Sequence, residues 1–343
     1  MKPMRALIVA FFFVAGCGGS NPPPAGPAGG AGGTGGGGAA GGGGGAGAGG
    51  AGGGPGGSWL TGASATLLAS TDGTTFLAHS APATGDLYAL TCVGHLDGWA
   101  AGAGGAIIAT HDGGTTWYAQ SSGVTTSLRA LSFADRDHGL AVGDAGVVLR
   151  TVDGGASWQR VAVATAADLR GVAMSQFDGR AFIVGAGGVM LRSTDGGASF
   201  AAPATIAAAT LRAVRFSGEA GAGYAVGDGG LVLATRDGAS WQALAAHAPA
   251  DLTALSISDD AARIVAVGAA GLVWRSVDAG ASWQSSPSGV TAALATIGFS
   301  DADPATGWAA GAHGTLLVTH DGGASFTHLA SPTTADLYSV EDL

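Results

Sequence analysis

Positive charge is scarce in this chain. Of its 343 residues, 14 are Lys or Arg and 24 are Asp or Glu, and lysine occurs once, at Lys2. Lys2 and Arg5 lie in a segment that we expect to be removed, which leaves 12 basic residues against 24 acidic ones. A nucleic-acid partner needs clustered Lys and Arg to displace counterions from its phosphates. The composition therefore excludes nucleic acid as the main ligand.

Cysteine is also rare. The chain has two cysteines, Cys17 and Cys92, which cannot supply a disulfide framework or a paired-cysteine metal motif. Cys92 stands in an apolar run and is predicted to be a small buried strand residue. The eight histidines are scattered along the sequence, so neither a metal site nor a cofactor is expected.

The N-terminus has the pattern of a secretory signal. Two basic residues precede the apolar run 6–14, which is too short to span a bilayer permanently. The run ends in Val14-Ala15-Gly16-Cys17, which resembles the bacterial lipobox. The resemblance implies that residues 1–16 are cleaved off, that Cys17 is lipidated and that the protein is anchored in the cell envelope. Gly18, where an Asp would retain the protein at the inner membrane, implies the outer membrane. The alternative is an ordinary signal whose cysteine happens to lie at the cleavage site.

Residues 17–57 are predicted to be a flexible tether. Between Gly18 and Gly57 there are 40 residues, 24 of them Gly, with no charged, aromatic or large aliphatic side chain. Such a segment cannot bury enough apolar surface to offset its ordering entropy. A Gly-rich coil of this length spans roughly 35 Å. The folded domain is therefore expected at 58–343.

One motif recurs through this domain. The pattern Ser/Thr-x-Asp-x-Gly-x-Ser/Thr-aromatic, called the Asp box, is typical of a tight turn, because its Asp accepts from backbone N–H groups and its Gly adopts positive φ. The seven copies are centred on Asp72, Asp112, Asp153, Asp195, Asp237, Asp278 and Asp321. Successive copies are 40 to 43 residues apart, and those ending at Phe76 and Trp241 are one residue short. Seven identical turns do not supply a catalytic carboxylate pair, so these aspartates are predicted to be structural.

The repeat predicts an all-β fold, a single seven-bladed propeller. Each unit has three strand signals besides the segment after the box, giving four strands, a to d, with the box at the c–d turn. The first unit lacks strand a, and the chain ends in a strand a at 336–340 with no unit after it. The C-terminal strand is therefore expected to complete the first blade, which removes an open sheet edge.

The unit from Asp97-Gly98-Trp99 to Trp117, repeated from Gly307 to Phe326, resembles the photosystem II stability and assembly factor family. The resemblance extends over all seven units. It implies a non-enzymatic factor that binds partner polypeptides during assembly. Relatives with this repeat occur in bacteria without photosystems, so a photosynthetic role is not implied.

In that family an arginine-rich face is thought to contact the client. The second position after the residue that opens strand a differs among the repeats: it is Tyr88, Arg129, Arg170, Arg212, Thr253, Ala295 and Tyr338. This position is expected on the face opposite the boxes, together with His313 and the turn aspartates Asp144 and Asp228. The Arg and Tyr residues and His313 are therefore candidates for binding a protein or peptide. Alternatively, the arginines only pair with neighbouring aspartates.

The competing function is that of a glycoside hydrolase or a carbohydrate-binding protein, since sialidases and xyloglucanases also carry Asp boxes. Sialidases need an arginine triad, an early Arg-x-Pro motif and a Tyr–Glu pair. This chain has no Arg-x-Pro early in the propeller, and its only glutamates are Glu219 and Glu341. Xyloglucanases place their carboxylates between two propellers. The box aromatics are periodic and are expected in the core, while Trp274 falls outside the pattern. We therefore expect a non-enzymatic, monomeric binding protein.

Overall fold

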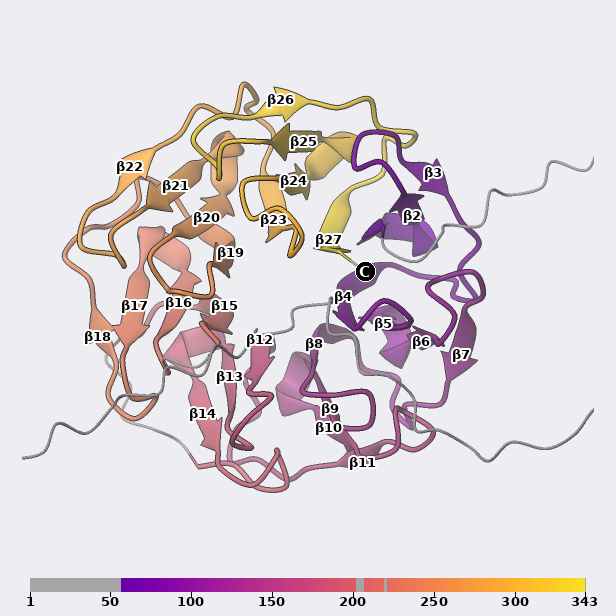
Figure 1. Cartoon of the computed structure of the whole chain (residues 1–343). Helices are drawn as coiled ribbons and strands as arrows, with labels where there is room; N and C mark the ends of the chain where they lie inside the picture. Colours follow the sequence, from indigo (N-terminus) through magenta and orange to yellow (C-terminus); the bar gives the residue numbers. More distant parts are fainter. Residues whose placement is uncertain (1–56, 202–206, 219–220, 343) are drawn as a thin grey trace, which may run out of the picture.

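The computed structural model describes residues 57–201, 207–218 and 221–342. The predicted signal, Cys17 and the tether up to residue 56 lie outside the described residues. Seven sheets stand in a ring (Figure 1), the arrangement that surrounds a central channel in propellers. We number the blades 1 to 7 in the order of their Asp boxes. No helix in the described part of the chain is long and apolar enough to cross a membrane.

The elements repeat in the same order in each blade. For blades 1 to 7, the inner strand a is β27 (Leu337–Asp342), β4 (Leu87–Val93), β8 (Leu128–Phe133), β12 (Leu169–Met174), β15 (Leu211–Phe216), β19 (Leu252–Ile257) and β23 (Leu294–Phe299). Strand b is β1 (Ser58–Gly62), β5 (Asp97–Gly102), β9 (Gly139–Gly143), β13 (Ala181–Gly185), β16 (Gly223–Gly227), β20 (Ile264–Gly268) and β24 (Gly307–Gly311).

A single 3-10 turn joins strands b and c. These turns are η1 (Ala63–Ala65), η2 (Ala103–Gly105), η3 (Asp144–Gly146), η4 (Ala186–Gly188), η5 (Asp228–Gly230), η6 (Ala269–Gly271) and η7 (Ala312–Gly314). Strand c is β2 (Leu67–Ser70), β6 (Ile107–Thr110), β10 (Val148–Thr151), β14 (Met190–Ser193), β17 (Val232–Thr235), β21 (Val273–Ser276) and β25 (Leu316–Thr319). The outer strand d is β3 (Leu77–Ala78), β7 (Tyr118–Gln120), β11 (Gln159–Arg160), β18 (Gln242–Ala243), β22 (Gln284–Ser285) and β26 (Thr327–His328).

Blade 4 follows the same plan in the residues that the structure describes. Its sheet contains β12, β13 and β14, and Ala201 forms a bridge to Arg192 at the place where strand d begins in the other blades. Residues 202–206 lie outside the described residues. The prediction of a single seven-bladed all-β propeller is confirmed.

The hydrophobic core lies between the blades. Strand b is buried along its whole length in blades 3 to 7, and its large side chains contact the next blade. Trp99 of blade 2, for example, stacks on Phe133 of blade 3 at 3.7 Å and donates its indole N–H to the Gly154 carbonyl at 2.9 Å. Full burial of one such side chain stabilises the fold by about 1.5–3 kcal/mol. Each blade therefore depends on its neighbours for its core.

Each b–c turn approaches the start of its own strand a closely. In blade 2 the N–H of Ala103 donates to the carbonyl of Asp86 at 2.8 Å. A Cβ at Gly102 would overlap that carbonyl oxygen, so only glycine fits at the end of strand b. The same glycine recurs in every blade, at Gly62, Gly102, Gly143, Gly185, Gly227, Gly268 and Gly311.

At four of the seven boundaries an aspartate links consecutive blades. Its carboxylate accepts the N–H of the central residue of the preceding blade's 3-10 turn, at 2.7–3.1 Å. These aspartates are Asp86, Asp168, Asp251 and Asp336, at the boundaries 1/2, 3/4, 5/6 and 7/1. Ser127, Thr210 and Ala293 occupy the position at the other boundaries. We call the four contacts the aspartate latches.

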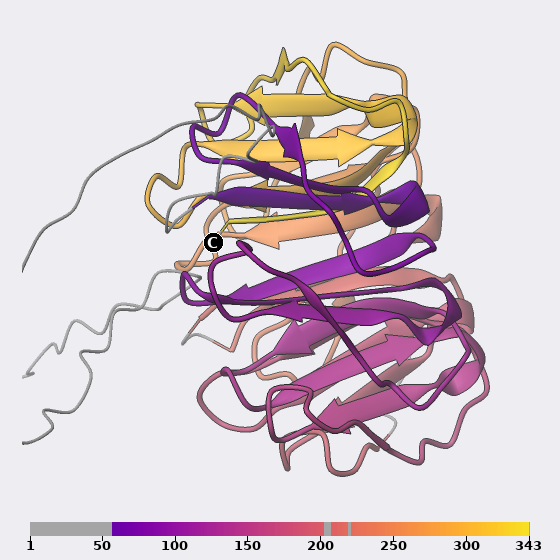
Figure 2. The same cartoon turned by 90° about the vertical axis from the view of Figure 1, so that its right-hand side faces the viewer.

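The ring closes as predicted. Strand β27 pairs antiparallel with β1, with Trp59 opposite Glu341 and Leu60 opposite Val340. The N–H of Ala63, in turn η1, also donates across this closure to the Asp336 carbonyl at 2.8 Å, while the carboxylate of Asp336 forms the latch to blade 7. Ser58 lies opposite both Ser70, beside the first Asp box, and Asp342, so both ends of the ring reach the Asp-box face. Figure 2 shows the C-terminus on the side away from the 3-10 turns.

The Asp boxes satisfy their own polar groups. In blade 3 one oxygen of Asp153 accepts from the Thr151 hydroxyl at 2.7 Å and the Ser157 N–H at 2.9 Å. The other oxygen accepts from the Ser157 hydroxyl at 2.6 Å. In the two short boxes, Asp72 and Asp237 accept from N–H groups two and three residues on.

Deletion of residues 336–343 removes strand β27 and one latch, so it leaves blade 1 without its inner strand. We expect the truncated protein to lose its cooperative thermal transition, because blades 1 and 7 then each expose a face of the core. Calorimetry of the truncated and full-length proteins tests this. A truncated protein that melts like its parent would show that closure is dispensable.

The Asp box of blade 4 makes stability depend on acid. Hydrogen bonds from the Ser199 hydroxyl, the Ser193 hydroxyl and the Ser199 N–H lower the pKa of Asp195 to about 2. The pKa of an Asp in the unfolded chain is about 3.9. The charged carboxylate of the box therefore stabilises the fold fully above about pH 4, and this contribution is lost as the pH falls towards 2.

We expect Asp195→Asn to have a lower melting temperature than the wild type at pH 7, and the two melting temperatures to converge between pH 4 and pH 2.

Calorimetry at several pH values measures this difference, with the exposed Asp137→Asn as the control for the loss of one negative charge. Melting curves of Asp195→Asn and wild type that stay parallel down to pH 2 would contradict the assignment.

Candidate functional site

A β-bulge opens the inner strand of every blade. In blade 3, Leu128 pairs with Gly143 and Ala130 pairs with Val142, so Arg129 has no partner on strand b. A bulge re-aims the side chain of its extra residue. The seven bulge residues, in blades 1 to 7, are Tyr338, Tyr88, Arg129, Arg170, Arg212, Thr253 and Ala295. These are the positions at which the sequence repeats disagree.

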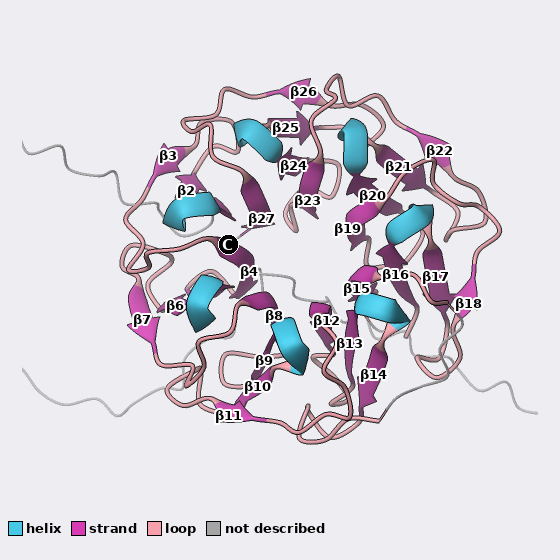
Figure 3. Cartoon of the chain, turned by 180° about the vertical axis from the view of Figure 1, so that it is seen from behind, coloured by secondary structure: helices cyan, strands magenta, loops and turns pink. Residues whose placement is uncertain are grey.

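The bulges lie beside the b–c turns, at the mouth of the central channel opposite the Asp boxes. Figure 3 views the ring from this side, with the short 3-10 turns towards the reader. Large side chains occupy the bulge in five consecutive blades, 1 to 5. We call this set the Tyr/Arg arc; it comprises Tyr338, Tyr88, Arg129, Arg170 and Arg212.

The first half of the arc is one connected cluster. The rings of Tyr88 and Tyr338 lie 5.4 Å apart, and the guanidinium of Arg129 lies 4.3 Å from the centre of the Tyr88 ring. The Tyr88 hydroxyl donates to Asp86 at 3.3 Å. Burial raises the pKa of both tyrosines, so they are neutral at pH 7. The cluster therefore presents two aromatic rings and a cation held against one of them.

The three arginines are paired with aspartates on the same face. Arg129 forms two parallel bonds to Asp144, at 3.0 and 2.7 Å. Arg170 donates to Asp168 at 2.9 Å, and its other terminal nitrogen lies 3.7 Å from Asp144. Arg212 donates to Asp228 at 2.5 Å. The hydrogen bond from Arg129 lowers the pKa of Asp144, so this carboxylate stays charged at neutral pH.

This pairing is what the alternative interpretation of the arginines predicted. It fixes the guanidinium groups without burying them: the arginine side chains of blades 3, 4 and 5 remain 27%, 32% and 39% exposed. Each arginine therefore keeps an accessible surface. Whether that surface binds a partner stays a prediction.

The rest of the ring has no comparable group. Thr253 donates its hydroxyl to the Leu294 carbonyl of the next blade at 2.6 Å, and Ala295 is too short to reach out. His313 lies on the same face but in turn η7, where it adopts a φ of 59° and its side chain is exposed. The Arg and Tyr candidates therefore lie on one arc, and His313, in blade 7, stays a separate prediction.

Two residues outside the repeat pattern pack against neighbouring side chains and are only partly exposed to solvent. Trp274, in strand c of blade 6, is half-buried and stacks on Trp283 with ring centres 6.4 Å apart. Cys92 is partly buried against the cluster that contains Leu90. Among the described residues there is no group of three or more His, Cys, Asp or Glu placed to hold a metal ion.

Comparison with known proteins agrees with this architecture. Residues 117–204 match the family model described as photosynthesis system II assembly factor YCF48. No curated protein matches the chain in sequence.

Among solved structures, YCF48 bound to D1 peptide is 21% identical with a TM-score of 0.61, over 76% of this chain and 87% of that one. YCF48 from Cyanidioschyzon merolae is 22% identical with a TM-score of 0.61, over 74% and 88%. The GH74 xyloglucanase from Xanthomonas campestris is 16% identical with a TM-score of 0.58, over 71% of this chain and 45% of that one.

At these identities the structural matches establish the fold, and the family model identifies the repeat. The resemblance predicted from the sequence is thereby confirmed: the chain is a seven-bladed Asp-box propeller similar to the photosystem II assembly factors, and residues 117–204 carry the repeat of that family.

Proposed function

We propose that this protein is a non-enzymatic, monomeric scaffold that binds a protein or peptide at the Tyr/Arg arc. The observation that carries the proposal is the connected cluster of Tyr338, Tyr88 and Arg129 at the channel mouth. Tyr and Arg are the residues that most often dominate binding energy at protein interfaces.

The arc is organised before any partner arrives. Two parallel bonds to Asp144 fix the guanidinium of Arg129, and stacking fixes the Tyr88 ring. Little side-chain entropy is then lost on binding, which favours affinity. An extended peptide across the mouth would stack on the tyrosines and receive hydrogen bonds from the remaining N–H groups of the arginines.

A peptide partner is also supported by the comparisons. The similar protein YCF48 has been solved with D1 peptide bound. We carry over the class of ligand, a polypeptide, and not the D1 protein itself, because the two chains are only 21% identical.

We further propose that the propeller is a lipoprotein of the cell envelope, anchored through Cys17 to the outer membrane. The support is the sequence Val14-Ala15-Gly16-Cys17 after a short apolar run. Strand β1 begins on the Asp-box face, so the tether joins the ring there. The arc lies on the opposite face and is thereby left free of the attachment point.

Hydrolysis or binding of a glycan is the second candidate, favoured by the likeness of fold to a xyloglucanase. That likeness covers 45% of the larger enzyme, and this chain forms one ring. We expect a screen of xyloglucan and sialoside substrates to give no turnover. Release of reducing sugar or sialic acid above the level of a heat-denatured sample would support the enzyme instead.

The arc is tested by changing its three arginines together. We expect Arg129→Ala, Arg170→Ala and Arg212→Ala in one protein to abolish a crosslinked partner that wild type captures from envelope membranes, because the variant loses three charged donors. The matched control changes Arg136, Arg160 and Arg236, which are exposed and lie outside the arc. An identical partner list for wild type and the arc variant would rule out binding through these arginines.

A further inference from the structure

The channel has a second mouth, on the Asp-box face, with a different lining. Two adjoining cavities, of about 170 and 260 Å³, open there where the inner strands end. They share the side chains of Phe216 and Asp259. Together they form one cleft that extends from blade 4 to blade 1.

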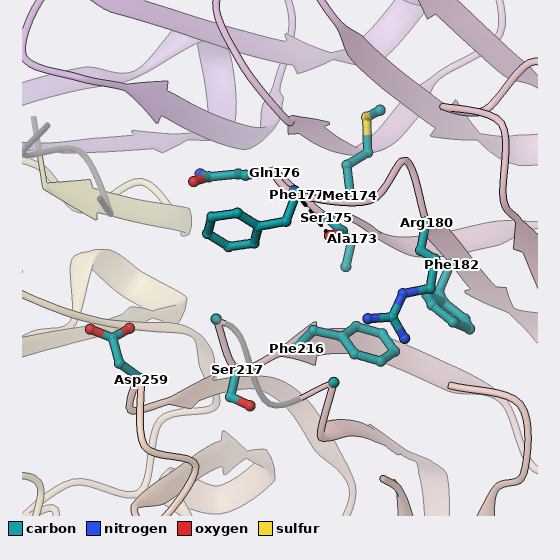
Figure 4. A pocket seen from close by; sticks show the side chains of 12 residues that line it. Ala173, Met174, Ser175, Gln176, Phe177, Arg180, Phe182, Phe216, Ser217 and Asp259 are labelled. Carbon is teal, nitrogen blue, oxygen red and sulfur yellow. Dashed lines mark hydrogen bonds between the residues drawn. The ribbon is translucent and has the colours of Figure 1, made fainter. Parts of the chain in front are cut away.

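One end of the cleft is less polar than the other, although Ser175, Gln176 and Arg180 also line it. Met174, Phe177 and Phe216 line the smaller cavity, and Phe177 is 60% exposed although it is a large hydrophobic side chain. Figure 4 shows the Phe177 ring projecting towards the side from which Asp259 comes, with Phe216 and Arg180 at the other end of the cavity. The volume is suited to one aliphatic or aromatic side chain. A cavity lined by aromatic and aliphatic side chains with a few polar groups has the usual form of a binding site.

The other end is charged, and its arginines already have neighbours. Arg215 lies 3.9 Å from Glu341, and the guanidinium of Arg263 lies 4.4 Å from the centre of the Phe299 ring. At the less polar end, Arg180 is held by Asp178 at 2.5 Å. Each of these three arginines therefore already lies close to a carboxylate or an aromatic ring of the protein itself.

Asp259, at the junction of the two cavities, is the exception. Among the described residues no group donates a hydrogen bond to its carboxylate, whereas the adjacent Asp260 accepts from the Ser258 hydroxyl and the Ala262 N–H. Asp259 is exposed, and partial desolvation and the nearby Asp260 raise its pKa. A cation bound beside the carboxylate would favour its charged form and so offset both effects.

We propose that this cleft is a second binding site, which takes a peptide segment with an apolar side chain and, two residues on, a lysine or arginine. Side chains two residues apart in an extended chain point to the same side, so the pair would enter the smaller cavity and reach Asp259 together. Residues 17–57, which lead into the ring, contain no charged residue and cannot supply this segment. We therefore take the ligand to be a segment of another protein.

The test uses purified full-length protein and three peptides, acetyl-Phe-Gly-Lys-amide and its analogues with norleucine or Glu in place of Lys, measured by calorimetric titration at low salt. We expect the Lys peptide to bind about tenfold more tightly than the norleucine peptide and the Glu peptide not to bind, since a charge-assisted hydrogen bond is lost or replaced by repulsion.

Two substitutions should weaken the Lys peptide by about tenfold each: Asp259→Asn, which removes the charge, and Phe177→Ala, which removes the exposed wall of the cavity. Their matched controls are Asp137→Asn and Val277→Ala, exposed residues of the same types on the same face outside the cleft. Equal melting temperatures of variant and wild type exclude unfolding as the cause.

Equal affinity of wild type and Asp259→Asn for the Lys peptide would overturn the proposal, as would equal binding of the Lys and norleucine peptides. Binding of xyloglucan oligosaccharide that is lost in Asp259→Asn, with none of the peptides bound, would assign the cleft to a glycan and also overturn it. The arginine variant of the arc should bind the Lys peptide like wild type, so this site and the proposed function of the arc fail or succeed separately.

Discussion

The close contact between each b–c turn and the start of its own strand a determines where this fold can vary. The turn N–H reaches the carbonyl before the first leucine of strand a, and the glycine at the end of strand b leaves room for it. The leucine is then fully buried, and the next residue falls at a bulge outside the ladder. Because the bulge residue contributes nothing to the ladder, its side chain is free to differ from blade to blade. The residues of the Tyr/Arg arc all occupy this variable position.

The two mouths of the channel are consequently different surfaces. On the b–c side, the variable side chains come from equivalent bulges and pair with aspartates that also come from equivalent positions, such as Arg129 with Asp144 and Arg212 with Asp228. On the Asp-box side, the a–b loops differ in length and composition, and the cleft around Asp259 arises where blades 4 to 7 and blade 1 happen to leave space. The repeat itself places the side chains of the first surface, whereas differences between the repeats shape the second.

This difference explains how much the sequence could predict. The seven-fold period, the box turns, the strand order and the closure by β27 all rest on local patterns repeated several times, so they could be read directly. The positions of the arc residues could be predicted because the repeats disagree there. The latches and the cleft could not be predicted, because they depend on how neighbouring blades are placed, as in the contact between Asp168 and the N–H of Ala145.

Blade 1 is assembled from the two ends of the folded domain, and this governs the order of folding. The other blades are built from contiguous segments. Strand β1, which contains Trp59, has an inner neighbour only once β27, which contains Glu341, has paired with it. Local contacts form quickly, and contacts between residues distant in sequence form slowly. Closing a flexible loop of this length costs about 5 kcal/mol in entropy by the logarithmic law. The last step of folding is therefore the insertion of one strand into a nearly complete ring, and blade 1 cannot form before residues 337–342 have been synthesised.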